Sequence, residues 1–299
     1  MLPQNFSGRI GQDAQEAVVI HDGEREELVL KVDYKIMGEE QPEDFAWIVT
    51  TPSEPDKYTL ADRGIFEQMD KLSQRVLKPT MRSKSFAPPR AVSLSSSGVE
   101  LGKRVQVGPY DIQPVRGVGS NALEGLNNWL KKNGYPTEDP DHMKYFVKNN
   151  FTFLCVKIHP KKGSSTVSKD GGLAPLQLSF KAPKPYYPLR FSSLQGVFDV
   201  SLHVLTREPL DFSASKHSLK KVSWTNPHYK RNHKLAKLNQ PTALSKIFKK
   251  GLVKNDEAWN YNHLICRDVN ENQSISTWKS DVTFETKEKL VNSSKFRVK

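Results

Sequence analysis

The chain has 299 residues and carries 45 Lys and Arg against 33 Asp and Glu, a net charge of +12. Its 36% of hydrophobic residues suffices for a packed core, and two domains are expected at this length. No apolar run is long enough to cross a bilayer, and residues 1–10 lack the pattern of a signal peptide, so we expect a soluble chain without a transmembrane segment. Two cysteines exclude a disulfide-dense scaffold and a four-cysteine metal site.

The N-terminal region, residues 1–77, is predicted to be β-rich with one helix. Residues 16–20 and 28–34 form a hairpin through Asp22-Gly23, and alternation in the second strand turns Leu28 inward and Glu27 outward. A third strand covers residues 45–49. Apolar residues at three- and four-residue spacings predict an amphipathic helix over residues 59–77. Its buried face is Ile65, Phe66, Met69, Leu72 and Val76.

The middle of the chain begins with a Pro/Ser-rich stretch, residues 78–98, which is typical of a surface loop or linker. Residues 99–212 then read as an α+β region with several antiparallel strands. We expect a strand pair or bent strand over 105–115, a helix capped by Ser120 or Asn121, and a helix from Pro140 to Lys148. Three further strands are predicted at residues 151–158, 176–180 and 198–204.

The C-terminal region, residues 213–299, is predicted to be a basic extension. Residues 1–212 carry 27 Lys and Arg against 26 Asp and Glu, whereas 213–299 carry 18 against 7. Helices are expected at residues 243–250 and 256–266, followed by a strand through Val282 and Phe284. The predicted fold class is α+β, with mainly antiparallel sheets and a few amphipathic helices packed on them.

Several segments together resemble a bacterial family. Residues 17–30 read AVVIHDGEREELVL and residues 43–56 read EDFAWIVTTPSEPD, and later landmarks include QVGPYD at 106–111 and YPLRF at 187–191. In this order they resemble the domain-of-unknown-function family DUF2330 over about residues 14–208. The family has no established catalytic residues to carry over. The resemblance implies an exported, extracytoplasmic protein, although this chain shows no signal peptide; a cytoplasmic location is the alternative.

Candidate catalytic residues are few. Phe45, Trp47 and Val49 form an aromatic stripe that we assign to core packing rather than ligand stacking. Glu39, Glu40, Glu43 and Asp44 lie around Gly38 and Pro42, which favours a solvated loop over a catalytic pair. Cys155 lies in the most apolar strand and is predicted to be an inert core thiol. The pattern Gly117-Val-Gly119 lacks the remaining residues of a phosphate-binding loop, so we interpret it as a turn before a helix.

Metal ligands are also considered in the C-terminal region. His228, His233, His263 and Cys266 have a formal zinc-ligand spacing, but a single cysteine and the long gap between the two pairs argue against a structural site. The sequence therefore predicts no metal site, no cofactor and no catalytic residue.

The basic segment, residues 213–255, contains 11 Lys and Arg and no acidic residue. Its interleaved aromatic residues combine charge neutralisation with stacking surfaces, so we expect it to bind a polyanion. The predicted binding residues are Lys220, Lys221, Trp224, Tyr229, Lys230, Arg231 and Lys234.

These features lead to three hypotheses about function. We expect a non-enzymatic binding or structural protein of the bacterial cell envelope that contacts an anionic envelope polymer or a membrane surface. The first alternative is a nucleic-acid-associated protein that uses residues 213–255. The second alternative is an enzyme with a site between the two folded regions.

Overall fold

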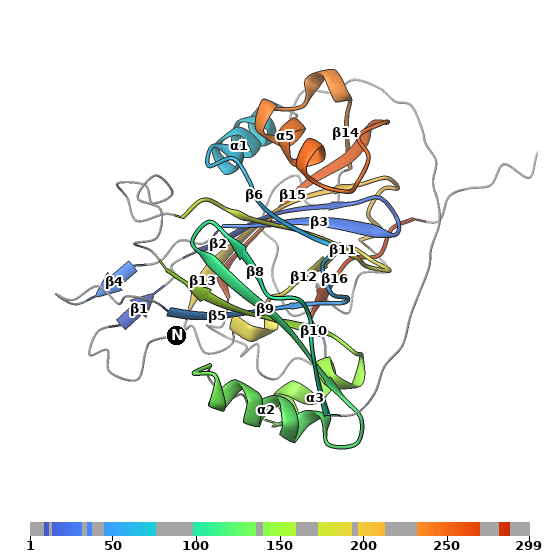
Figure 1. Cartoon of the computed structure of the whole chain (residues 1–299). Helices are drawn as coiled ribbons and strands as arrows, with labels where there is room; N and C mark the ends of the chain where they lie inside the picture. Colours follow the sequence, from blue (N-terminus) through green and yellow to red (C-terminus); the bar gives the residue numbers. More distant parts are fainter. Residues whose placement is uncertain are drawn as a thin grey trace, which may run out of the picture.

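The computed structural model describes residues 9–11, 14–31, 35–37, 45–75, 98–135, 140–159, 173–192, 197–212, 232–269 and 281–287. Two sheets dominate these residues (Figure 1). The larger sheet has seven strands in the order β14-β15-β13-β2-β3-β11-β6. In that order they are β14 (His233–Leu235), β15 (Trp259–Val269), β13 (Phe198–Thr206), β2 (Ala14–His21), β3 (Arg25–Leu30), β11 (Leu176–Lys181) and β6 (Lys57–Leu60).

The smaller sheet has five strands, in the order β5-β10-β9-β7 with β8 also paired to β9. Its strands are β5 (Phe45–Thr51), β10 (Thr152–Ile158), β9 (Tyr110–Val118), β7 (Gly98–Leu101) and β8 (Val105–Val107). Two short ribbons pair β1 (Arg9–Gly11) with β4 (Lys35–Met37) and β12 (Tyr186–Tyr187) with β16 (Val282–Thr283). Every pairing is antiparallel except that of β13 with β2, so the predicted fold class is confirmed.

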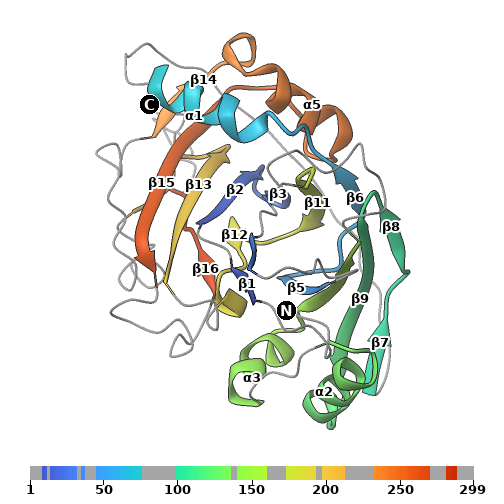
Figure 2. The ribbon, with the colours of Figure 1, turned by 90° about the vertical axis from the view of Figure 1, so that its left-hand side faces the viewer.

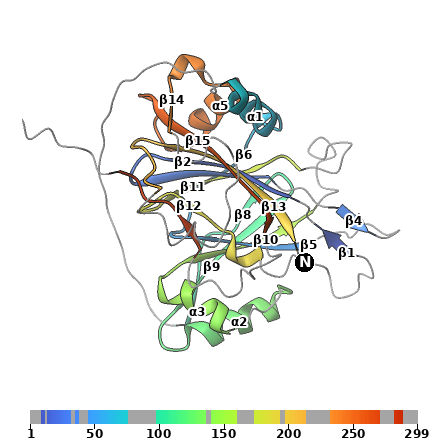
Figure 3. The ribbon, with the colours of Figure 1, turned by 180° about the vertical axis from the view of Figure 1, so that it is seen from behind.

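Helices cover the outer sides of the two sheets. They are α1 (Ile65–Arg75), α2 (Ala122–Lys132), α3 (Pro140–Lys148) and α5 (Thr242–Lys250), with single 3-10 turns η1 (Arg190–Ser192) and η2 (Lys237–Asn239). Figures 1 and 3 show α1 and α5 together on the larger sheet and α2 and α3 at the opposite side of the molecule. None of the helices in the described ranges is long and apolar enough to span a membrane.

The strand order brings distant segments together. Figure 2 shows β13 between β15, from the C-terminal part of the chain, and β2, from its N-terminal part. The larger apolar core lies between the sheets and reaches α2 and α3; Phe146, Val156 and Leu202 belong to it. A second core lies between the larger sheet and helices α1 and α5, where Met69 and Ile247 are buried. The larger sheet is therefore covered on both faces.

The predicted N-terminal hairpin is confirmed, with Gly23 at a φ of +116° in its turn. The prediction that Glu27 points to solvent is wrong, because β3 is covered on both sides and the Glu27 side chain is 0% exposed. The carboxylate accepts hydrogen bonds from Gln177 and Ser179 on β11 and from the amides of Leu252 and Val253 after α5. A charged residue can be buried at this position because these donors replace water.

Two helix predictions need correction. The first helix begins at Ile65 rather than residue 59, since residues 57–60 pair with β11 as strand β6. The helix expected at 256–266 is absent, because the chain from Trp259 onward forms strand β15. The two faces of this strand pack against different cores: Trp259 and Tyr261 belong to the core under α1 and α5, and Leu264 and Cys266 to the core between the sheets. Its aromatic and β-branched residues also favour a strand over a helix.

Several other predictions are confirmed, whereas the short strands β1, β4, β7, β12 and β14 were not predicted. Helices α2, α3 and α5, the strand pair β8–β9 and the central position of β10 between β5 and β9 are confirmed. Residues 32–34, 38–44, 78–97 and 213–231 lie outside the described residues, and so do the side chain of Phe45 and residue Val76.

Candidate metal centre

Polar side chains interrupt the apolar core between α1 and the larger sheet. In β13, Val200, Leu202 and Val204 face the other sheet, so alternation turns Ser201 and His203 toward α1. His203 lies directly opposite His263 of β15, and the two rings stack with centroids 4.1 Å apart. Two imidazoles from neighbouring strands therefore meet under the helix.

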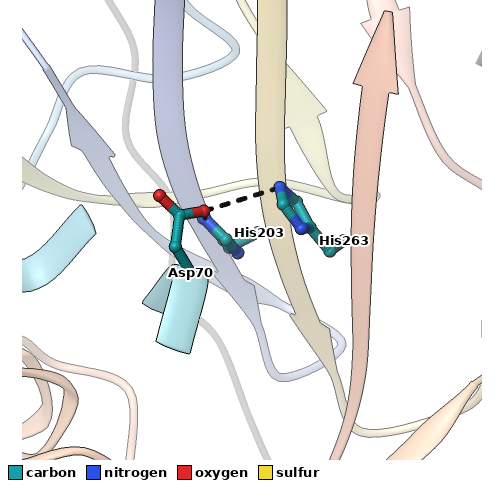
Figure 4. Close-up of side chains that lie close together, drawn as sticks. All are labelled: Asp70, His203 and His263. Atoms are coloured by element: carbon teal, nitrogen blue, oxygen red, sulfur yellow. Dashed lines mark ion pairs between the residues drawn. The ribbon is translucent and has the colours of Figure 1, made fainter. Parts of the chain in front are cut away.

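Helix α1 supplies a carboxylate above the two rings. Met69 is buried in the helix–sheet core, and the next residue, Asp70, points its carboxylate at both imidazoles (Figure 4). Asp70 Oδ1 lies 3.4 Å from Nε2 of His203 and 4.0 Å from Nε2 of His263. The side-chain exposures are 46% for Asp70, 1% for His203 and 9% for His263. The cluster thus has a buried floor of two rings and a partly exposed carboxylate.

Hydroxyl groups hold the far nitrogen of each ring. Nδ1 of His263 lies 2.7 Å from Ser73 Oγ, and Nδ1 of His203 lies 2.8 Å from Tyr261 Oη, which itself donates to the Met69 carbonyl oxygen at 3.4 Å. In the metal-free arrangement Nε2 of His203 donates to the Asp70 carboxylate, and Nε2 of His263 lies 2.9 Å from Ser201 Oγ. With the proton of each ring on Nδ1, both Nε2 lone pairs become available to an ion beside Asp70. Such outer hydrogen bonds are characteristic of histidines that bind metals.

The charge state of the cluster also suits a cation. Burial, aided by the neighbouring His203, lowers the pKa of His263 to about 3, so this imidazole is neutral at physiological pH. The hydrogen bond with His203 lowers the pKa of Asp70, which keeps the carboxylate ionised. Burial raises the pKa of Tyr261, so its phenol stays protonated. A neutral imidazole and a carboxylate are the protonation states that metal binding requires.

The three ligand atoms are close enough to share one ion. They all lie within 4.8 Å of one another, and no other His, Cys, Asp or Glu in the described ranges joins the group. Tetrahedral zinc, with bonds near 2.0 to 2.2 Å, places its ligand atoms about 3.3 to 3.5 Å apart. The Asp70–His203 separation already fits, and the Asp70–His263 separation must shorten by roughly half an ångström. The two rings are stacked with their planes 19° apart, so one ring must also turn before both Nε2 lone pairs point at the same ion.

The structure combines different residues from those that the sequence spacing suggested. His263 belongs to the cluster, whereas Cys266 lies opposite Val200, nearer the end of β15. His233 lies in β14 opposite Tyr261, and His228 is outside the described residues. The alternating polar positions Ser201 and His203 of β13 are the sequence signal of the site. Their pairing with residues 60 positions later depends on strand register, which the sequence spacing does not reveal.

The predicted polyanion-binding residues are placed only in part. Lys234 is half-buried in β14. Lys220, Lys221, Trp224, Tyr229, Lys230 and Arg231 lie outside the described residues.

Other candidate groups do not assemble a site with the cluster. Cys155 is buried in β10, and burial raises the pKa of its thiol, which suppresses the reactive thiolate.

Trp47 is half-buried and lines a pocket of about 80 Å³ with Gln15, Tyr187 and Phe191. Asp281 is buried and accepts hydrogen bonds from the backbone amides of residues 189, 190 and 282. These bonds tie β16 to the turn η1.

Comparisons with known proteins identify a family. No curated protein matches the sequence. Among solved structures, baculovirus P35 is similar at 12% identity, with 97% of this chain and 100% of that chain covered and a TM-score of 0.43. A mutated baculovirus P35 after caspase cleavage gives 12% identity, coverage of 93% and 100%, and a TM-score of 0.42. Scores this low support no inference about fold or function.

The sequence profile of DUF2330, described as an uncharacterized protein conserved in bacteria, matches residues 4–247, and this chain therefore belongs to that family.

Proposed function

We propose that this protein is a non-enzymatic binding protein of the bacterial cell envelope that holds one first-row divalent transition metal ion between α1 and the larger sheet. The observation that carries the proposal is the convergence of Asp70, His203 and His263, with both Nε2 atoms facing the carboxylate and both Nδ1 atoms held by hydroxyl oxygens.

The donor set favours a transition metal over calcium or magnesium. Ca²⁺ and Mg²⁺ prefer oxygen ligands, whereas two imidazoles and a carboxylate suit Zn²⁺, Co²⁺, Ni²⁺ or Fe²⁺. Zinc is the natural probe because it accepts tetrahedral nitrogen and oxygen ligands without redox chemistry.

The position of the cluster explains why binding is the proposed role. An ion bound here joins α1 to β13 and β15, three elements that meet only in the folded chain. An ion that binds the folded form stabilises it, by about 2.7 kcal/mol when the free ion is present at 100 times its Kd. The metal would thus hold the helix on the sheet.

The envelope location and the anionic partner remain separate parts of the proposal. They are supported by the family resemblance and by the 11 basic residues without an acidic one in residues 213–255. The nucleic-acid alternative uses the same segment and predicts a preference for single-stranded nucleic acid over other polyanions. Fractionation of cells that express the full chain tests the location; recovery in the cytosol alone would contradict it.

Equilibrium dialysis of chelator-treated protein tests metal binding. We expect one Zn²⁺ or Co²⁺ per chain and no competition from excess Ca²⁺ or Mg²⁺. The variant His263→Gln should lose affinity on the order of 100-fold or more, because one of three protein ligands is removed. His21→Gln is the matched control, since His21 is also buried in the larger sheet but contacts Ala182 rather than the cluster. Equal affinity in both variants would place the metal elsewhere.

A further inference from the structure

We infer that the metal ion held by Asp70, His203 and His263 keeps a coordination position open for an exogenous oxyanion, a carboxylate or a phosphate, whose second oxygen accepts a hydrogen bond from Ser201. This inference rests on the proposed function and adds the class of ligand that the site recruits.

The ligand count leaves a position open. The described residues provide three ligand atoms, and sites with three protein ligands complete their coordination with water or an external ligand. His203 and His263 form the buried floor, whereas the Asp70 side chain is 46% exposed. The remaining position therefore opens toward solvent along the Asp70 side of the cluster.

The charge of the loaded site favours an anion. A divalent ion with one carboxylate and two neutral imidazoles carries a net charge of +1. Lys31 lowers the pKa of Asp70, and Lys31 itself pairs with Glu16 at 2.9 Å. Because these two charges balance each other, the positive charge of the loaded site remains. An oxyanion at the open position neutralises it in a partly buried place, where charges interact strongly.

Ser201 supplies a donor only when the metal is present. Its Oγ lies 2.9 Å from Nε2 of His263, so in the metal-free arrangement the hydroxyl donates to that nitrogen. A bound metal takes the same lone pair, and the Ser201 hydroxyl hydrogen then needs another acceptor. An oxygen of a metal-bound carboxylate or phosphate provides it at the open side. Ser73 cannot take this role, because it contacts the opposite ring nitrogen at 2.7 Å.

Cobalt-loaded full-length protein tests the inference, because the visible spectrum of Co²⁺ reports each change of its ligands. Protein with one Co²⁺ per chain is titrated with acetate, inorganic phosphate and, as a neutral probe, acetamide. Saturable spectral changes are expected with the oxyanions and not with acetamide. The ratio of the acetate and phosphate affinities shows whether a carboxylate-bearing or a phosphate-bearing ligand is the better match.

Ser201→Ala identifies the donor. At full Co²⁺ loading, verified by metal analysis, we expect this variant to bind the preferred oxyanion about tenfold more weakly, the loss of one hydrogen bond to a charged group. Ser192→Ala is the control, since Ser192 is a buried serine that contacts Gln15, away from the cluster. Thermal melting confirms that both variants are folded.

The outcomes separate the two proposals. Failure of the full-length protein to bind Co²⁺ overturns the proposed function itself. Bound Co²⁺ with a spectrum that no oxyanion changes leaves the metal site intact and overturns the open position. Oxyanion binding of equal strength in Ser201→Ala and the unsubstituted protein overturns the assignment of the donor.

Discussion

Replacing Glu27 with alanine should destabilise the fold severely. The carboxylate accepts from Gln177 Nε2 at 2.9 Å, Ser179 Oγ at 2.6 Å, Leu252 N at 2.5 Å and Val253 N at 3.0 Å. Alanine removes this acceptor from Ser179 Oγ and from the amides of Leu252 and Val253 in a site where Glu27 is 0% exposed. Gln177 Nε2 keeps its bond to the Ile247 carbonyl oxygen at 3.1 Å. Each unmet donor costs about 1 to 3 kcal/mol, and with partial relaxation the expected loss of unfolding free energy is about 4 kcal/mol.

Urea unfolding followed by circular dichroism measures this loss. Glu24→Ala is the control, because Glu24 lies in the exposed hairpin turn next to β3 and should change the unfolding free energy by less than about 0.5 kcal/mol. A loss below about 1 kcal/mol for Glu27→Ala would refute the reasoning, since it would mean that water already reaches the carboxylate.

Three further predictions concern other parts of the chain. Burial raises the pKa of Asp281 to about 6. Between about pH 4 and 6 the folded chain therefore retains a proton that the unfolded chain releases. Because the folded state binds more protons in this range, the unfolding free energy falls as pH rises. Relative to the parent, Asp281→Asn should therefore gain about 2 kcal/mol of unfolding free energy from pH 4 to pH 7. A difference between the two proteins that stays constant with pH in urea unfolding would contradict this. Cys155 should react with a thiol reagent only after denaturation; rapid labelling of the folded protein speaks against an inert thiol. Replacing Lys220, Lys221, Lys230 and Arg231 with Gln should weaken binding to a polyanion and make the affinity less dependent on salt, as measured by fluorescence anisotropy. Unchanged binding would exclude the basic segment as the polyanion-binding site.

The basic segment must be tested by substitution rather than truncation. A truncation after Phe212 removes β15, which pairs with β13 along nearly its whole length, and also removes α5 from the second core. Such a chain would lose part of the larger sheet. Its failure to bind a polyanion would then report misfolding.

Local patterns predicted most of the elements correctly because their signals are short-range. The turn at Asp22-Gly23, Pro140 at the start of α3 and the apolar face of α1 each depend on neighbouring residues. The burial of Glu27 did not follow from its strand, because its acceptor role depends on residues 150 or more positions away. Alternation suggested an exposed side chain where the fold places a second layer.

The metal cluster illustrates the same limit. Asp70 appears as a polar residue on the outer face of a helix, and His203 as a polar residue in a half-buried strand. Only the register of β13 with β15 and the docking of α1 bring them to His263. Sequence spacing grouped His263 with His228, His233 and Cys266, a set that we rejected, because spacing detects ligands that are close along the chain, whereas this cluster joins three separate elements.

The central claim is tested most directly by crystals of the zinc-soaked protein, measured on both sides of the zinc absorption edge. The account predicts one anomalous peak within about 2.2 Å of Asp70 Oδ1 and of Nε2 of His203 and His263. Its coordination sphere should include an oxygen that does not belong to the protein. A peak at other residues, or no peak with the three side chains in their hydrogen-bonded arrangement, would contradict the account.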